Sequence, residues 1–352
     1  MDAVFGRPVA RARNRVAVPR QIRYRTPAVV ALAMALAVAG VLALASGAIP
    51  VSLVDLFGNA ANELHRAVLL EIRAPRVLLA GCVGAALALS GAALQGLFRN
   101  PLADPGLIGV SSGAALGASV MIVLGGGMAI ASVLAPYIVP LAAIAGALLV
   151  TWFLYLFSTR YGQFSIVTIV LVGIATNALA GVGIGVLQYL SDDAGLRTLT
   201  FWMMGSFGRA TWPTTTPAVF LMLAAAVPIL IVARSLDLLQ LGEAEAWYMG
   251  VDVRRLKRGV VLSSAAAVGA GVALVGIVGF VGLVVPHLVR LAIGAGHRHL
   301  LPGAALLGAT LTILADTLAR TAASPAEIPV SLVTSALGAP FFLWLIARER
   351  PR

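Results

Sequence analysis

The sequence predicts an all-α integral membrane protein with about ten transmembrane helices. Of its 352 residues, 60% are apolar and 11% are charged, whereas soluble domains carry about 25% charged residues. The apolar residues form runs of about twenty, the length that a helix needs to cross a bilayer, rather than the ten-residue alternation of a barrel strand. Gly is frequent, with 37 residues, as in closely packed membrane helices. Together these observations favour a helix bundle.

Ten apolar segments are expected to span the membrane. Their approximate limits are 27–47, 77–97, 107–126, 136–157, 165–188, 215–234, 259–277, 280–293, 302–320 and 331–347. The first is too long for the apolar region of a cleaved signal peptide, so we expect it to remain, after a basic cytoplasmic arm over residues 1–26. A single transmembrane domain is then expected over residues 27–347, followed by a cytoplasmic tail over 348–352.

The Lys and Arg residues predict the orientation of this bundle. An even number of spans puts both termini on one side, and a cytoplasmic location assigns 19 of the 25 Lys and Arg residues to that side. Such an excess is typical of cytoplasmic loops. We therefore expect cytoplasmic termini. The formal charge of +11 is then an orientation signal in the lipid bilayer, and nucleic acid is not expected as a partner.

Two hydrophilic stretches are longer than simple turns. A cytoplasmic loop is expected over residues 235–258, with a basic cluster from Arg254 to Arg258. On the outer side, Ser191 begins a stretch that leads into an amphipathic segment ending near Trp212. Contacts with partners and substrate are expected at these two places.

Several sequence motifs follow the predicted spans in a distinctive order. They are Arg73-Ala-Pro-Arg76, the turn from Asn100 to Gly113, Gly242 to Val251, Val278 to Arg290, Ala315-Asp316, Glu327-Ile-Pro329 and Gly338 to Phe341. In this order they resemble the FecCD permeases, the membrane subunits of type II ABC importers for iron-siderophores, heme and vitamin B12. The resemblance covers residues 28 to 347. It implies a homodimer in the bacterial inner membrane, with a central pathway, two ATP-binding subunits at the cytoplasmic face and a periplasmic substrate-binding protein.

The resemblance also implies that the 235–258 stretch couples the chain to the ATPase, through Gly242, Glu243, Glu245, Trp247 and Gly250. An ordinary solvated loop is the alternative. The chain itself has no P-loop, because that motif needs Gly-Lys-Ser/Thr and the single lysine, Lys257, precedes Arg258. We therefore expect a transporter subunit that is not an enzyme, with ATP bound and hydrolysed by separate subunits.

On the outer side, the resemblance gives Arg73, Arg76 and Arg320 the role of docking acidic residues of the binding protein. The alternative is that these side chains only snorkel at helix ends. Asp316 and Glu327 suggest a proton relay, and so a secondary transporter, but an ion pair of Asp316 with Arg320 one turn away is favoured.

The segment from Leu196 to Trp212 resembles the heme branch of the family, and heme is therefore the expected cargo. This implies that a propionate pairs with Arg197 and that the ring faces Phe201, Trp202, Met203 and Met204. An interfacial aromatic belt is the alternative. No residue pair suits axial ligation of heme iron, so neither a stably bound cofactor nor a metal site is expected. A ferric siderophore or vitamin B12 is the alternative cargo.

The family's narrow inner gate corresponds to Ser165, Ile166 and Val167, which would form a constriction where two copies meet. Gly-rich packing between the copies is expected at Gly181 to Gly185 and Gly113 to Gly117. A last alternative is an intramembrane serine hydrolase, since Gly109-Val-Ser111-Ser-Gly113 matches a nucleophile-elbow pattern and His287 could act as its base.

Overall fold

The structure is a computed structural model, and it describes residues 25–47, 63–125, 134–159 and 165–348. The described residues are helical and contain no strand. The helices are α2 (Arg25–Ala45), α3 (Glu63–Ala67), η2 (Val68–Arg73), α4 (Ala74–Phe98), η3 (Pro105–Ile108), α5 (Val110–Leu124), α6 (Ala135–Thr159), α7 (Ile166–Leu190), α8 (Asp193–Met203), α9 (Trp212–Ile231), α10 (Ala233–Leu239), α11 (Glu243–Tyr248), α12 (Val253–Val275), α13 (Val281–Ile293), α14 (His297–Thr321) and α15 (Val330–Arg348).

Each of the ten expected spans corresponds to one apolar helix. Seven helical segments are long and apolar enough to cross a membrane, and α5, α13 and α15 supply three shorter apolar helices. The expected basic arm lies almost wholly outside the described residues, because α2 begins at Arg25. The all-α prediction is therefore confirmed for the described residues, and each expected span has its own apolar helix.

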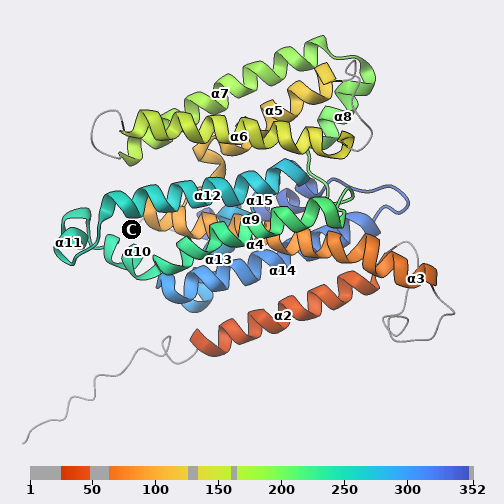
Figure 1. The fold of residues 1–352 in the computed structure, drawn as a ribbon. Helices are drawn as coiled ribbons and strands as arrows, with labels where there is room; N and C mark the ends of the chain where they lie inside the picture. Colours follow the sequence, from red (N-terminus) through yellow and green to blue (C-terminus); the bar gives the residue numbers. More distant parts are fainter. Residues whose placement is uncertain (1–24, 48–62, 126–133, 160–164, 349–352) are drawn as a thin grey trace, which may run out of the picture.

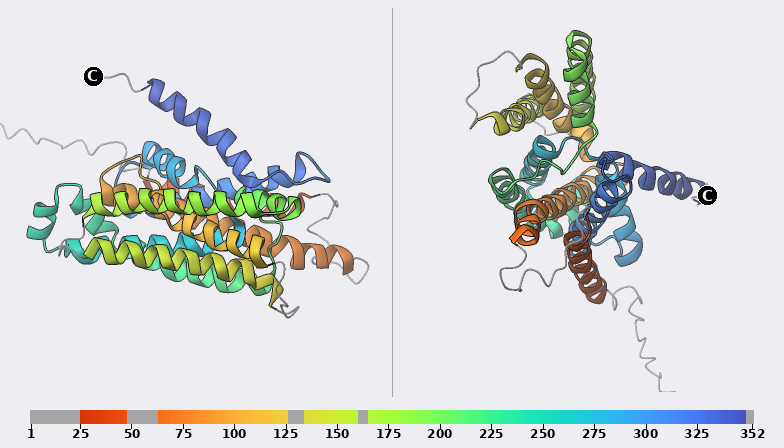
Figure 2. Two further views of the ribbon diagram at one scale, coloured as in Figure 1. Left: turned by 90° about the horizontal axis from the view of Figure 1, so that it is seen from above. Right: turned by 90° about the vertical axis from the view of Figure 1, so that its right-hand side faces the viewer.

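The helices run roughly along one direction, which gives the bundle two ends (Figure 1). One end, called the inner end below, carries α10 and α11, and the start of α2 and the end of α15 lie there too. The outer end carries α3 and α8. Helices α5, α6, α7 and α8 form one group against the rest, while α15 runs obliquely away from the bundle (Figure 2). Both described chain ends thus share one end of the bundle, as an even number of spans requires.

Helix α4 is the centre of the bundle. All its residues from Ala86 to Leu97 are buried, as expected for a helix that is apolar on every side. It packs closely on α14, because a Cβ at Gly84 would collide with the carbonyl of Gly308. The low side-chain volume of these glycines lets the two backbones touch.

The glycines of α5 also pack inside the chain, which corrects one expectation. A Cβ at Gly113 or Gly117 would collide with the backbone of α6, and Gly146 of α6 approaches the backbone of Gly113 in the same way. The prediction that Gly113 and Gly117 pack between two copies is therefore wrong. Gly181 and Gly185 of α7, by contrast, have open space around them.

The turn between α4 and α5 is built from polar caps. The Asn100 Oδ1 accepts a hydrogen bond from the Leu102 N–H at 2.9 Å, and the Asp104 Oδ1 accepts one from the Gly106 N–H at 2.7 Å. Ser111 caps nothing here; it lies in the first turn of α5, whose N-cap is Gly109. Because η3 rather than a strand precedes it, the strand-to-helix turn of a nucleophile elbow is missing at this place.

Candidate functional site

The expected coupling loop is largely helical. It contains the end of α10, the short α11 and the first turns of α12, where the basic cluster Arg254 to Arg258 lies. Two glycines with positive φ flank α11, Gly242 at 136° and Gly250 at 86°, values that residues with a side chain rarely adopt. The basic cluster therefore belongs to the start of the long helix α12 rather than to a loop.

Helix α11 exposes an aromatic tip at the inner end of the bundle. Trp247, Tyr248 and Met249 are exposed, and the rings of Trp247 and Tyr248 lie 5.1 Å apart, edge to face. Glu245 is exposed as well, while Ala246 is fully buried and anchors the helix. Such a tip, apolar at the inner end of the bundle, is suited to contact another protein.

The predicted gate residues and the coupling residues line one cavity at the inner end. It measures about 930 Å³, and its lining includes Ser165, Ile166, Val167, Glu243, Trp247 and Gly250. Ser165 begins α7 as its N-cap, with Oγ accepting from the Thr168 N–H at 3.4 Å. The structure therefore brings together two sets of residues that are about 80 positions apart in the sequence.

Two residues that line this cavity form an ion pair. The Nζ of Lys257, in α12, donates to the Glu243 Oε2 of α11 at 2.7 Å. The Lys257 side chain is only 8% exposed, whereas that of Glu243 is 44% exposed. From the sequence, no contact was predicted for Lys257. A single lysine at the start of an apolar helix nevertheless indicates that its charge has a partner.

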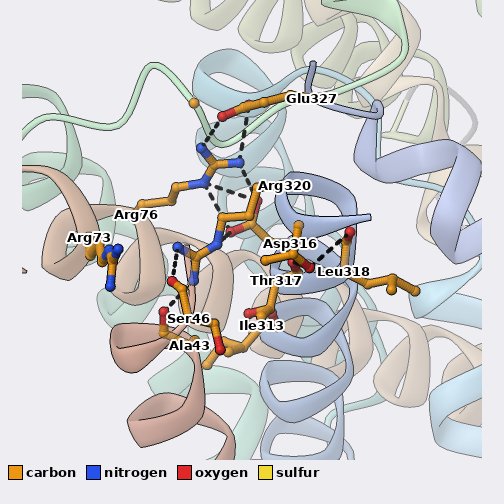
Figure 3. Close-up of polar contacts among 12 residues, drawn as sticks. Ala43, Ser46, Arg73, Arg76, Ile313, Asp316, Thr317, Leu318, Arg320 and Glu327 are labelled. Carbon is orange, nitrogen blue, oxygen red and sulfur yellow. Dashed lines mark hydrogen bonds and ion pairs between the residues drawn. The ribbon is translucent and has the colours of Figure 1, made fainter. Parts of the chain in front are cut away.

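At the outer end, Arg76 is the centre of a charged cluster (Figure 3). Its Nε and Nη2 donate to both carboxylate oxygens of Asp316, and its Nη1 donates to the Glu327 Oε1 at 2.7 Å. The expected ion pair of Asp316 with Arg320 is present at 3.8 Å, but the distance from Asp316 to Arg76 is shorter, at 2.9 Å. The cluster joins α4, α14 and the segment that leads into α15.

Arg73 and Arg320 bind the end of α2. The Nη1 of Arg73 donates to the carbonyls of Leu44 and Ala45, and Arg320 donates to those of Ser46 and Ala43. These last carbonyls of a helix have no partner within it, and the negative end of its dipole favours cations. The side-chain bonds thus fix the outer end of α2 on the bundle.

This burial corrects the expected location of the docking arginines. Arg73 and Arg76 are 4% and 9% exposed, and the Arg320 side chain is 8% exposed. They do not form an open basic surface, because they are buried and donate hydrogen bonds to carboxylates and helix carbonyls. The exposed member of the cluster is Glu327, with 45% of its side chain accessible.

Helix α8 separates the expected cargo residues onto different faces. Asp192 caps the helix by accepting a hydrogen bond from the Gly195 N–H at 2.8 Å. Arg197 and Phe201 are exposed, with the guanidinium carbon 5.9 Å from the ring centroid. Trp202 is buried and turned toward the bundle, and Met203 and Met204 are partly buried. Of the five expected cargo residues, only Arg197 and Phe201 therefore face away from the bundle.

The cavities beside α8 are small. Trp202 lines both of them, at about 160 Å³ and 210 Å³, below the ~300 Å³ of ordinary ligand pockets. Among the described residues, no group of three or more His, Cys, Asp or Glu side chains could hold a metal ion. A large cargo is not enclosed at this end by the described part of one chain.

The sequence is similar to that of known membrane permeases. The sequence profile of the FecCD transport family matches residues 32–348. The hemin transport system permease protein HmuU of Yersinia pestis is 51% identical over 304 residues, which cover 86% of this chain and 90% of that protein. The vitamin B12 import system permease protein BtuC of Vibrio cholerae is 40% identical over 295 residues, covering 83% and 86%.

A solved structure shares the fold. It describes an inward-facing conformation of a protein assigned as a metal-chelate type ABC transporter. The TM-score is 0.80 at 34% identity, and the match covers 92% of this chain and 99% of the other. The expected order of motifs and the observed order of helices thus agree with a known transporter architecture.

Proposed function

The chain belongs to the FecCD transport family, and we propose that it is the permease subunit of an ATP-driven importer that carries heme inward across the bacterial inner membrane. The observation that carries the choice of cargo is the greater similarity to a hemin permease than to a vitamin B12 permease. The family membership makes it a transporter subunit rather than an enzyme.

The outward face of α8 is the proposed first contact with heme. Arg197 offers a guanidinium to a propionate, a charge-assisted pair of the stronger kind. Phe201, next to it on the same face, offers an apolar ring surface to the macrocycle. Trp202, Met203 and Met204 then support this face from behind rather than touching the cargo directly.

A second copy of the chain is the proposed partner along the pathway. The two cavities beside α8 are too small to enclose heme in the described part of one chain, which supports a pathway at the interface between two copies. Helix α7 has an open apolar face with Leu171, Ile174 and Val182 more than half exposed. In this arrangement Ser165, Ile166 and Val167 of the two copies would meet at the inner gate.

Two separate ATPase subunits are proposed at the inner end. The exposed tip of α11, with Trp247 and Tyr248, supplies the apolar contact that such a partner would cover. Gly242 and Gly250 supply the turns that set α11 apart from its neighbours, and Glu243 and Glu245 give it acidic side chains. We infer that the inner end faces the cytoplasm, because the Lys and Arg excess belongs to that side.

A periplasmic binding protein is the proposed partner at the outer end. Because Arg76 is held by Glu327 in the free chain, docking would proceed by exchange: an acidic side chain of the binding protein replaces Glu327 on Arg76. Arg73 and Arg320 then contribute by keeping the outer end of α2 and the Arg76 cluster in position.

Uptake into proteoliposomes tests the function. The chain is reconstituted with its ATPase and binding protein, and ATP-dependent uptake is compared for heme, a ferric siderophore and cobalamin. Preferential heme uptake supports the proposal. Preferential cobalamin or siderophore uptake would instead select another cargo of the same family, and uptake without an ATPase would favour a secondary transporter.

A further inference from the structure

Lys257 is the only lysine in the chain, and its position is unusual. It lies in the second turn of the apolar helix α12, it is 6% exposed, and its ammonium binds Glu243 at 2.7 Å. Burial of an ammonium group is costly even when the group is paired. An apolar residue of similar length would pack there without that cost, so the charge indicates a role beyond packing.

The ion pair joins α11 to α12, two helices that make few other contacts with each other. Helix α11 is a single short helix whose ends are glycines with positive φ. It is held to the bundle by the buried side chain of Ala246 and by the Glu243 carboxylate at its first position. Glu243 therefore attaches α11 to a membrane helix through an ion pair with Lys257.

The attachment lies between the two surfaces that a transport cycle has to connect. On one side, the tip of α11 exposes Trp247 and Tyr248. On the other, Lys257 lines the 930 Å³ cavity whose lining also includes Ser165, Ile166 and Val167 at the start of α7. A displacement of the α11 tip would reach α12 through the Glu243 carboxylate.

We propose that Lys257 is a positioning residue that ties α11 to α12, so that movement of the ATPase at α11 is transmitted to the membrane bundle. This inference rests on the proposed function, since it assumes an ATPase at the α11 tip. It assigns no contact between Lys257 and either ATP or the cargo. The tie needs opposite charges on the two elements, and it does not need the lysine to be on α12.

The test uses three variants and one matched control in the reconstituted complex. Lys257→Gln removes the tie, Glu243→Gln removes its other half, and the double exchange Lys257→Glu with Glu243→Lys reverses the charges. Arg255→Gln is the control, because Arg255 forms an exposed pair with Asp252 at 3.0 Å on the same turns of α12. The measured quantity is the number of ATP molecules hydrolysed per heme delivered.

We expect Lys257→Gln and Glu243→Gln to raise this number at least about fivefold, the lower range of coupling between sites. Arg255→Gln should leave it unchanged, and the charge reversal should return it to about the wild-type value. The inference is overturned if Lys257→Gln behaves like Arg255→Gln. It is also overturned if the charge reversal assembles normally but stays as uncoupled as Lys257→Gln.

A second readout separates this inference from the proposed cargo. Stimulation of ATP hydrolysis by the docked binding protein requires the same transmission but no heme transport. If the wild type delivers no heme, the cargo proposal fails, and the four variants are compared by this stimulation instead. Lost stimulation in Lys257→Gln, with recovery on charge reversal, would still support the tie; full stimulation would refute it.

Discussion

The guanidinium of Arg76 holds both carboxylate oxygens of Asp316, at 3.0 Å from Nε and 2.9 Å from Nη2, across 240 residues of sequence. Both side chains are nearly inaccessible. The pair therefore fastens α4 to α14 at the outer end of the bundle, where Arg320 and Glu327 join it.

Replacement of Arg76 by Gln should destabilise the fold, because it leaves the Asp316 carboxylate buried without its main partner. Breaking a buried pair in this way costs about 3–5 kcal/mol. Unfolding of the purified protein in detergent measures the loss. Arg66→Gln is the control, since Arg66 is exposed on α3 and should change stability by no more than about 0.5 kcal/mol. Equal stability of the two variants would refute the role given to Arg76.

Replacement of Glu327 by Gln should strengthen docking of the binding protein. The Glu327 carboxylate occupies the Nη1 of Arg76 at 2.7 Å, and its removal frees that donor for a carboxylate of the partner. Because Glu327 is 45% exposed, the expected gain is modest, roughly three- to tenfold in affinity, at the weaker end for bonds to charged groups. Binding to the permease in nanodiscs measures it.

Glu63→Gln is the control for this gain, since Glu63 is exposed at the same end of the bundle. Unchanged or weaker affinity of the Glu327→Gln variant would contradict the exchange of carboxylates at Arg76.

Replacement of Gly146 by Ala should lower stability, while the same change at Gly40 should not. The new methyl group at position 146 meets the backbone of Gly113, and overpacking of this kind costs about 1–3 kcal/mol. At Gly40, inside α2, the space is open, and Ala is favoured over Gly within a helix by about 0.5–1 kcal/mol. Thermal unfolding of both variants in detergent checks the difference, and similar effects at the two sites would argue against the α5–α6 packing.

The stability of the protein should depend on pH through Asp104, in the turn between α4 and α5. Burial raises the pKa of this carboxyl above its ordinary value, although the hydrogen bond from the Gly106 N–H opposes the shift. A raised pKa in the folded state means that the charged form costs stability at neutral pH and that this cost disappears as the pH falls through the raised pKa.

Asp104→Asn removes the charge and retains an oxygen that can accept the Gly106 hydrogen bond. This variant should therefore be more stable than the wild type at neutral pH, and the difference should shrink as the pH is lowered toward the ordinary carboxyl range. Unfolding measured over that pH series checks the sign. A difference that grows on acidification would contradict it.

Local patterns in the sequence were sufficient to locate the membrane helices. Segment length and hydropathy predicted ten helices close to their observed limits, because each helix has to match the bilayer by itself. The basic cluster from Arg254 to Arg258 was assigned to a loop because charges interrupt apolar runs. In the structure those charges occupy the first turns of α12, where the apolar helix extends beyond its membrane-crossing part.

Local sequence patterns could not predict contacts between residues that are far apart in the chain. Asp316 was paired with Arg320 because the two are one turn apart, whereas Arg76 binds it from another helix. Likewise, the α8 residues Phe201 and Trp202 are neighbours in sequence, but they point about 100° apart around the helix, so that Phe201 is exposed and Trp202 is buried. The burial of Arg73 and Arg76 depends on where the end of α2 packs, which composition and spacing do not determine.

Cargo selectivity of the reconstituted complex is the most direct test of the central claim. Proteoliposomes that contain the chain, its ATPase and its binding protein should take up heme only with ATP, at least about tenfold faster than cobalamin, a difference of ~1.4 kcal/mol. Arg197→Gln should reduce heme uptake by about the same factor, with Arg66→Gln as control. Cobalamin uptake equal to or faster than that of heme, or heme uptake that needs no ATP, would contradict the account.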